Sequence, residues 1–369
     1  MNFDFSEDQV SLRDAVQRWV EKGFSFERRH ALAKAGGATR EVYAELAELG
    51  LAGLAVPEAH GGMNFGPVEA MVVMEELGRG LVNAPFAEAA LVAPALLAGA
   101  PEAVQAAWLP RMAEGSALVV PALQERRGRY RLEATDTTAS AAGDGFTVSG
   151  SKSLVPAGDE ADAFIVSARH GNGTGLFLVE KAAAQVRGYP TQDGARAAEV
   201  SFSNAPALLV AQDGLPVLSH ATDVGIAAVC AEAVGLMDRL LAITVEYMNQ
   251  RKQFGVTIAS FQALRHRVAD VKMQVELGRS MSYFATLKLG EPQEQRRRAL
   301  SQAKVQLGHS MRYVGQQCVQ LHGGIGVTDE YVASHYFKRL TMLEMAWGDT
   351  LHHLGEVSAR MQDTAGVFA

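Results

Sequence analysis

Residues 300–321 carry apolar side chains at intervals of seven residues. A second apolar residue follows two of these positions after four residues, and the full set is Leu300, Leu307, Met311, Val314, Cys318 and Leu321. This spacing places all of them on one stripe of an α-helix, which is typical of helices packed in a left-handed bundle. Residues 229–247 and 264–275 keep a similar spacing of three or four. The sequence therefore predicts that residues 216–369 form an antiparallel four-helix bundle.

The rest of the chain divides into two zones. Residues 1–115 are expected to be helical, beginning with Ser6 and Gln9 at the spacing of a capping box. Residues 116–215 contain short β-rich runs separated by Gly, Asp and Pro, namely 118–120, 146–148, 164–166, 176–179, 200–202 and 208–210. No helical pattern interrupts them, so we expect a small β-barrel or sandwich rather than a parallel βαβ sheet. The predicted fold class is α+β, with an N-terminal helical domain, a middle β domain and a C-terminal helical bundle.

Charge and cysteine content exclude several classes of protein. With 34 Lys and Arg against 41 Asp and Glu, the formal charge is −7, so neither nucleic acid nor an anionic membrane is expected as a partner. Cys230 and Cys318 lie in apolar helical patterns, which favours buried thiols over a disulfide or a metal site. The N-terminus lacks the pattern of a signal peptide, and the apolar stretch 89–97 is too short to span a bilayer. We therefore expect a cytoplasmic protein.

The first candidate binding segment is 250–255, which reads Gln-Arg-Lys-Gln-Phe-Gly. Gly255 is expected to end a long helix, so that Arg251 and Phe254 lie near a helix end. There a cation can pair with a phosphate, and an aromatic face can pack on a base. A basic helix C-terminus also complements the helix dipole without any ligand. Taken alone, this segment favours the simpler interpretation.

The second candidate segment is 320–328, which reads Gln-Leu-His-Gly-Gly-Ile-Gly-Val-Thr. Its glycines free the backbone for positive φ and for close approach to another molecule. The N–H groups of such a loop can form an anion-binding nest. One glycine would suffice to cap a helix, so three glycines beside Gln320 and His322 favour a binding function.

A metal site is not predicted from the histidines. The four candidates have no Cys, Asp or Glu at ligand spacing around them, and they are His322, His335, His352 and His353. We expect them at the surface or in interfaces.

Together, the two segments resemble the acyl-CoA dehydrogenase family, which carries Arg-x-x-Phe-Gly and Gln-x-x-Gly-Gly-x-Gly in this order and at about this separation. Residues 75–79 and 146–152 extend the resemblance into the N-terminal and middle zones. It implies an FAD-dependent oxidation of acyl-CoA to 2,3-enoyl-CoA, with electron-transfer flavoprotein as the electron acceptor. By the same resemblance, this chain would bind the FAD of a neighbouring subunit. Arg251 would pair with the pyrophosphate, and Phe254 would pack near the adenosine. The other residues of this site would be Gln253, Gln262, Gln320, Gly323 and Gly324.

Other family positions are different in this sequence. The family's Thr-Glu-Pro-x-x-Gly-Ser-Asp stretch corresponds to 121–128 and its Trp-x-Thr segment to 153–158, and neither retains the groups that line the flavin. The two family positions for the carboxylate base fall on Trp347 and near Gly225, so no catalytic residue is predicted. Asp349 is an alternative base, although we expect it to cap the following helix.

This pattern is similar to the small subunit of two-gene bacterial members of the family, such as pimeloyl-CoA dehydrogenase-like and steroid side-chain enzymes. The resemblance implies a heterotetramer in which this chain has a degenerate site of its own and contributes to the FAD site of a larger homologous subunit. Two alternatives stay open. One is a self-sufficient homotetramer with an atypical base, and the other is a non-catalytic scaffold that kept the fold.

Overall fold

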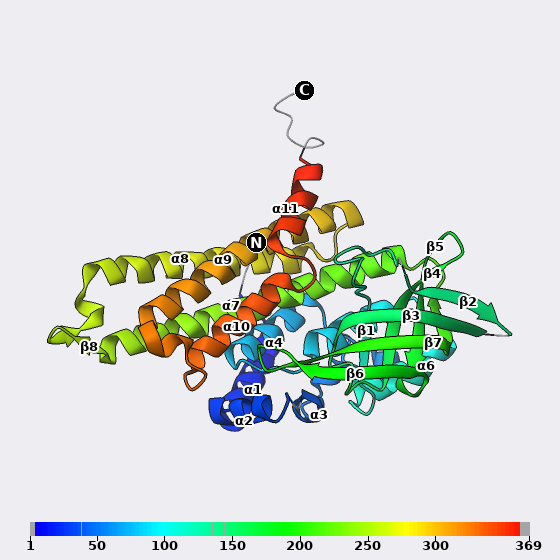
Figure 1. The fold of residues 1–369 in the computed structure, drawn as a ribbon, viewed down its shortest axis with the longest axis horizontal. Helices are drawn as coiled ribbons and strands as arrows, with labels where there is room; N and C mark the ends of the chain where they lie inside the picture. The colour runs from blue at the N-terminus through cyan, green and yellow to red at the C-terminus, as the bar shows by residue number, and fades with distance from the viewer. Residues whose placement is uncertain (1–3, 38, 135, 144, 362–369) are drawn as a thin grey trace. The chain divides into compact units, whose positions relative to one another are not determined.

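The computed structural model describes residues 4–37, 39–134, 136–143 and 145–361 (Figure 1). The chain forms two compact units. Unit 1 consists of Met1–Arg28, Pro67–Val82 and Ile226–Ala369, and unit 2 consists of Arg29–Gly66 and Asn83–Gly225.

Unit 1 begins with α1 (Glu7–Gly23), which packs against α4 (Pro67–Arg79). The predicted capping box is confirmed. The Ser6 Oγ accepts a hydrogen bond from the Gln9 backbone N–H at 3.2 Å, and the Gln9 side chain accepts one from the Ser6 N–H at 3.0 Å. The chain therefore enters α1 with two otherwise unpaired donors satisfied.

Long helices make up the rest of unit 1 (Figure 1). They are α7 (Leu215–Gln250), which begins in unit 2, α8 (Gln262–Lys288), α9 (Gln293–His322), α10 (Val332–Met345) and α11 (Thr350–Ala359). Helix α9 packs against α8, α10 and α11. All six side chains of the predicted stripe on α9 are buried, which confirms the helix-packing pattern. Cys230 and Cys318 are buried free thiols, as predicted.

Helices α4 and α7 touch backbone to backbone. A Cβ added to Gly78 of α4 would lie 2.1 Å from the Glu232 carbonyl oxygen. A Cβ added to Gly235 of α7 would lie 1.9 Å from the Glu75 carbonyl oxygen. The two glycines therefore permit a helix crossing that no larger residue allows. Arg279 of α8 donates to the Glu75 carboxylate at 2.5 Å beside this crossing.

Unit 2 contains short helices and one sheet. The helical segments are α3 (Thr39–Glu48), the π-helical η3 (Ala87–Val92), α5 (Ala93–Leu97) and α6 (Glu102–Ala113). The strands are β1 (Val119–Ala122), β2 (Thr138–Ala142), β3 (Gly145–Pro156), β4 (Ala163–His170), β5 (Gly173–Glu180), β6 (Ala184–Pro190) and β7 (Arg196–Ala211). Helix α2 (Phe26–Lys34) spans the boundary between the two units.

The sheet closes on itself. Its order is β1-β4-β2-β3-β7-β5, and β5 also pairs with β4, so that five strands form a ring with Phe164 and Phe177 fully buried. Apart from the β1–β4 and β2–β4 pairs, the strand pairs are antiparallel. The sequence predicted a small β-barrel or a sandwich, and this ring agrees with the first of these two alternatives.

Three details of the sheet differ from the prediction. The runs 200–202 and 208–210 belong to one strand, β7, because Pro206 between them pairs with Thr147 instead of ending the strand. Strands β2 and β6 were not predicted. Small residues in β2 and an exposed, partly polar β6 lack the β-rich signal.

None of the described helices is both long and apolar enough to cross a membrane.

Candidate functional site

The chain between α7 and α8 forms a two-residue hairpin. Strand β8 (Lys252–Gln253) pairs with β9 (Val256–Thr257), which leaves Phe254 and Gly255 as the turn with φ of 54° and 82°. Two consecutive left-handed residues are typical of a type I′ turn, where Asn and Gly are usual. Gly255 therefore forms the turn and does not end α7, as the sequence had suggested. The helix ends at Gln250.

Phe254 is unusual at this position. The left-handed conformation costs a residue with a Cβ roughly 1 kcal/mol, and the Phe254 side chain is 93% exposed. Its ring makes only an edge contact with Phe261, with 6.3 Å between the centroids. The fold thus presents an aromatic face to solvent from a strained backbone, and nothing within the described chain explains this arrangement.

Arg251 is held by its backbone and not by its side chain. Its N–H donates to the Tyr247 carbonyl, and its carbonyl accepts from the Ile258 N–H, both at 2.8 Å. The exposed guanidinium makes no hydrogen bond or ion pair with any other residue that the structure describes. It is therefore available to an anion from another molecule. Gln253 and Gln262 are exposed on either side of the hairpin turn.

Helix α9 ends in an open glycine loop, η6 (Gly323–Val327). Gly323 has φ 66° and ψ −143°, a conformation that essentially only glycine adopts. A Cβ added to Gly323 or Gly324 would meet nothing within 4 Å, so the space above both is open. Gly326 differs, because an added Cβ would lie 2.7 Å from the Val319 carbonyl oxygen. Packing within the chain therefore requires Gly326 only.

One detail corrects the predicted anion nest. The Gly323 N–H donates to carbonyls in the last turn of α9, including that of Gln320. It therefore caps the helix and does not point at an external anion. Gln320 itself is exposed beside the loop.

The two segments lie at the same end of the bundle. Met248 of α7, Ile258 after the hairpin and Leu321 of α9 form one buried cluster. The rings of Tyr247 and His322 stack beside it, with 4.6 Å between their centroids. Figure 1 shows the hairpin, labelled β8, at the tip where α7 meets α8. All seven predicted cofactor residues are exposed at this end.

Comparison with known proteins decides the family. The acyl-CoA dehydrogenase N-terminal domain matches residues 6–116, and the C-terminal domain of the same family matches residues 212–362. Acyl-CoA dehydrogenase IpdE2 of Mycolicibacterium smegmatis is 30% identical over 337 residues, which cover 90% of this chain and 92% of that protein. The chain belongs to the acyl-CoA dehydrogenase family.

Solved structures of the family resemble this chain over its full length. The ChsE4–ChsE5 complex from Mycobacterium tuberculosis matches with a TM-score of 0.89 and 25% identity, covering 99% of this chain and 100% of that one. A variant of the Tcur3481–Tcur3483 steroid ACAD matches with a TM-score of 0.89 and 28% identity, covering 98% of this chain and 99% of that one. These similarities confirm the predicted acyl-CoA dehydrogenase fold.

The family uses FAD, and the exposed groups at the bundle end suit the adenosine diphosphate half of that cofactor. An unpaired guanidinium at Arg251 suits a pyrophosphate, because charge-assisted hydrogen bonds are the strongest that a phosphate can receive. The exposed ring of Phe254 suits the face of an adenine. The open space over Gly323 and Gly324, which any side chain would fill, suits a close approach of the phosphates.

Around Trp347, one of the two family positions for the base, both carboxylates of residues 344–349 accept hydrogen bonds from this chain. Asp349 begins α11, and its Oδ1 accepts from the His352 N–H at 2.8 Å, which confirms the predicted helix cap. The Glu344 carboxylate accepts from the Thr350 N–H at 3.0 Å and from the Thr350 hydroxyl at 2.6 Å. Trp347, at the family position, has φ 58°.

Two buried side chains, those of Lys304 and His353, bond to the backbone of residues 343–348. Lys304 is fully buried, and its Nζ donates to the carbonyls of Leu343, Glu344 and Gly348 at 2.8–2.9 Å. His353 is also fully buried, and its Nε2 donates to the Trp347 carbonyl at 3.0 Å. Burial lowers the pKa of Lys304 to about 8 and the pKa of His353 to about 3, so the imidazole is neutral. These hydrogen bonds therefore fix the backbone around Trp347.

The predicted surface position of the histidines was wrong for three of them. His322, His335 and His353 are 3%, 4% and 0% exposed. Each has a ring nitrogen within 2.8–3.0 Å of a backbone carbonyl, at Cys318, Asp329 and Trp347 respectively. Each bond satisfies one nitrogen of the buried ring and so lowers the free-energy cost of burying it.

A buried ion pair in the barrel was not predicted. Lys152 and Glu125 are 0% and 4% exposed, with 2.9 Å between Nζ and Oε1. Glu125 also accepts from the N–H groups of Asp136 at 2.8 Å and Thr137 at 3.0 Å. Glu125 lies in the segment 121–128, which corresponds to the family's flavin-lining stretch. No signal in the sequence indicated this pair, because Glu125 is followed by two arginines and Lys152 lies between two serines.

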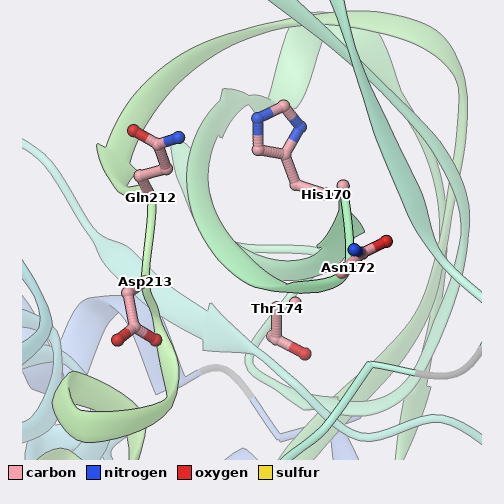
Figure 2. Close-up of a pocket in the computed structure, with 7 residues that line it drawn as sticks. His170, Asn172, Thr174, Gln212 and Asp213 are labelled. Atoms are coloured by element: carbon pink, nitrogen blue, oxygen red, sulfur yellow. The ribbon is translucent and has the colours of Figure 1, made fainter.

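A separate pocket lies in unit 2, at the turn between β4 and β5. Figure 2 shows His170, Asn172 and Thr174 around this turn, facing Gln212 and Asp213 of the segment after β7. None of the predicted cofactor residues lines it.

Proposed function

We propose that this chain is one subunit of a heteromeric acyl-CoA dehydrogenase, which oxidises an acyl-CoA to the 2,3-enoyl-CoA. In this proposal the β8–β9 hairpin and the glycine loop bind FAD held mainly by a larger homologous subunit. The observation that carries it is Phe254, which stands 93% exposed on a strained turn beside the unpaired Arg251. The similarity to a chain of the ChsE4–ChsE5 complex supports a hetero-oligomer.

The chemistry that FAD supplies when bound is acceptance of the hydride that leaves the β-carbon. Removal of the α-proton needs a carboxylate within hydrogen-bond reach. In this chain Asp349 and Glu344 both accept backbone N–H groups, which supports assignment of the proton transfer to the partner subunit. The residues of this chain would then bind and orient the cofactor. We retain electron-transfer flavoprotein as the proposed acceptor of the electrons.

Purification of the chain alone and together with its homologous partner tests this assignment. We expect the lone chain to be colourless and the complex to contain about one FAD for every two chains, with enoyl-CoA formed by the complex only. If the lone chain retains one FAD per chain and forms enoyl-CoA, the self-sufficient enzyme is correct instead. If neither sample binds flavin, the scaffold alternative is correct.

Arg251→Ala should weaken FAD binding to the complex by about 1.5–3 kcal/mol, because one charge-assisted contact to the pyrophosphate is lost. This corresponds to a rise in Kd of roughly ten- to a hundredfold. Flavin fluorescence during titration of the apo complex measures it. Arg298→Ala, which removes an arginine from the second turn of α9, far from the end that carries the glycine loop, is the matched control and should leave the Kd unchanged. An unchanged Kd in a well-folded Arg251→Ala complex would refute the role of Arg251.

A further inference from the structure

His322 turns its ring into the protein at the end of α9. Its Nδ1 lies 2.8 Å from the Cys318 carbonyl oxygen, and the residue is 3% exposed. Since a carbonyl only accepts hydrogen bonds, Nδ1 carries the proton and Nε2 is left as an acceptor. That Nε2 is buried and has no hydrogen-bond partner among the described residues. Such an atom needs an explanation, because an unpaired buried acceptor costs about 1–3 kcal/mol.

The imidazole joins the two proposed cofactor segments. Its ring lies against that of Tyr247, with 4.6 Å between centroids and an angle of 31°, and contacts that of Tyr331 at 5.1 Å and a steeper 53°. Tyr247 lies in the last turn of α7, and its carbonyl accepts the Arg251 N–H at 2.8 Å. Gly323 follows His322 directly, and Tyr331 is the N-cap of α10. The ring therefore links Arg251 and the glycine loop, next to the buried cluster of Met248, Ile258 and Leu321.

We propose that His322 is a positioning residue that sets the distance between Arg251 and the Gly323–Gly324 loop, and that it does so only as the neutral imidazole. The inference rests on the proposed FAD-binding function and names a residue within it that contacts no cofactor. The unpaired Nε2 is consistent with this role, because an unprotonated Nε2 brings neither a charge nor an unpaired N–H between the rings.

Protonation would place a second N–H at Nε2, where no described group accepts it. The groups that face the ring are Tyr247 of α7, the Cys318 carbonyl of α9 and Tyr331 before α10, and none of these is a carboxylate. Glu246, next to Tyr247, is exposed and accepts from the Gln250 side chain at 3.1 Å. A protonated His322 therefore has no nearby anion in hydrogen-bond contact to stabilise it.

The direction of the pH effect follows from the burial. Desolvation is the largest influence on the pKa of His322 and lowers it below the ordinary value of 6.5, while the Cys318 carbonyl opposes this shift. When the glycine loop opens, the imidazole of His322 is exposed to water, and there its pKa is higher than in the closed stack. Hence the closed stack is fully stable above about pH 6.5 and loses stability as the pH falls below that value.

Three variants of the assembled holo complex test the proposal, with FAD retention followed by flavin fluorescence at about pH 7.5 and about pH 5.5. His322→Phe keeps an aromatic ring in the stack but cannot be protonated, so it should bind FAD within about threefold of wild type at both pH values. Wild type should lose affinity at the lower pH, by at most about tenfold. His322→Ala removes the stack and should bind roughly tenfold more weakly at both. His309→Ala, an exposed histidine on the same helix, is the control and should behave as wild type.

Two results would overturn the proposal. One is wild-type FAD retention by a folded His322→Ala complex, and the other is an equal loss at low pH in wild type and His322→Phe. If His322→Ala does not fold, the comparison of wild type with His322→Phe decides alone. Arg251→Ala, measured in parallel, separates this inference from the proposed function. Weak binding by Arg251→Ala with normal binding by His322→Ala refutes only the role of His322, whereas normal binding by both refutes the FAD site itself.

Discussion

Replacing Lys304 with methionine should lower the free energy of unfolding by about 3–5 kcal/mol. Methionine fills a similar volume but leaves the carbonyls of Leu343, Glu344 and Gly348 without their donor. Because these carbonyls lie in the last turn of α10 and in the connection to α11, that connection should loosen as well. Urea unfolding followed by far-UV circular dichroism measures the change, with the m-value checked for constancy.

The matched control is Lys272→Met on α8. Lys272 is more than half exposed, and within the described part of the chain its Nζ bonds only to Glu276, at 2.6 Å. An exposed pair of this kind contributes about 0.3–0.5 kcal/mol at most. If the free energy of unfolding of Lys304→Met lies within about 1 kcal/mol of the wild-type value, the three hydrogen bonds do not stabilise this connection.

Gly235→Val should destabilise unit 1 by about 3 kcal/mol, because an added side chain would force α4 away from α7. Its Cβ would lie 1.9 Å from the Glu75 carbonyl oxygen and 2.8 Å from the Arg79 nitrogen, and backbone atoms of a packed helix cannot yield as a flexible side chain can. The melting temperature measured by calorimetry should fall by several degrees.

Gly355→Val on α11 is the control for the intrinsic effect of valine in a helix. Gly355 is exposed, and an added Cβ there meets nothing within 4 Å. Its stability should change by less than about 0.5 kcal/mol. Equal melting temperatures of the Gly235→Val and Gly355→Val proteins would contradict the close crossing of α4 and α7.

The parts of the fold that the sequence predicts are those set by local patterns. The stripe from Leu300 to Leu321 needs only the helical repeat, and the Ser6–Gln9 cap needs only adjacent residues. The barrel followed from turn residues at short intervals. The stripe and the cap depend on the residues of one element, so a spacing rule contains the necessary information.

The residues that the sequence could not place depend on distant partners. Lys304 and the carbonyls that it binds are 39–44 residues apart, and Glu125 and Lys152 are 27 apart. Nothing local distinguishes these lysines from solvated ones. The burial of His322 has the same origin, since the rings that contact it come from α7 and from the residue before α10. Gly255 was misassigned because a turn glycine and a helix-ending glycine look the same in sequence.

The β8–β9 hairpin is already ordered before any partner arrives. Its backbone is fixed by pairing of Gln253 with Val256 and by the bond from the Ile258 N–H to the Arg251 carbonyl. Within the hairpin, association therefore orders only exposed side chains, at a cost of about 0.5–1.5 kcal/mol for each one that is immobilised. The hairpin does not have to fold on contact, so the rate at which a complementary surface binds it should be governed by diffusion and orientation.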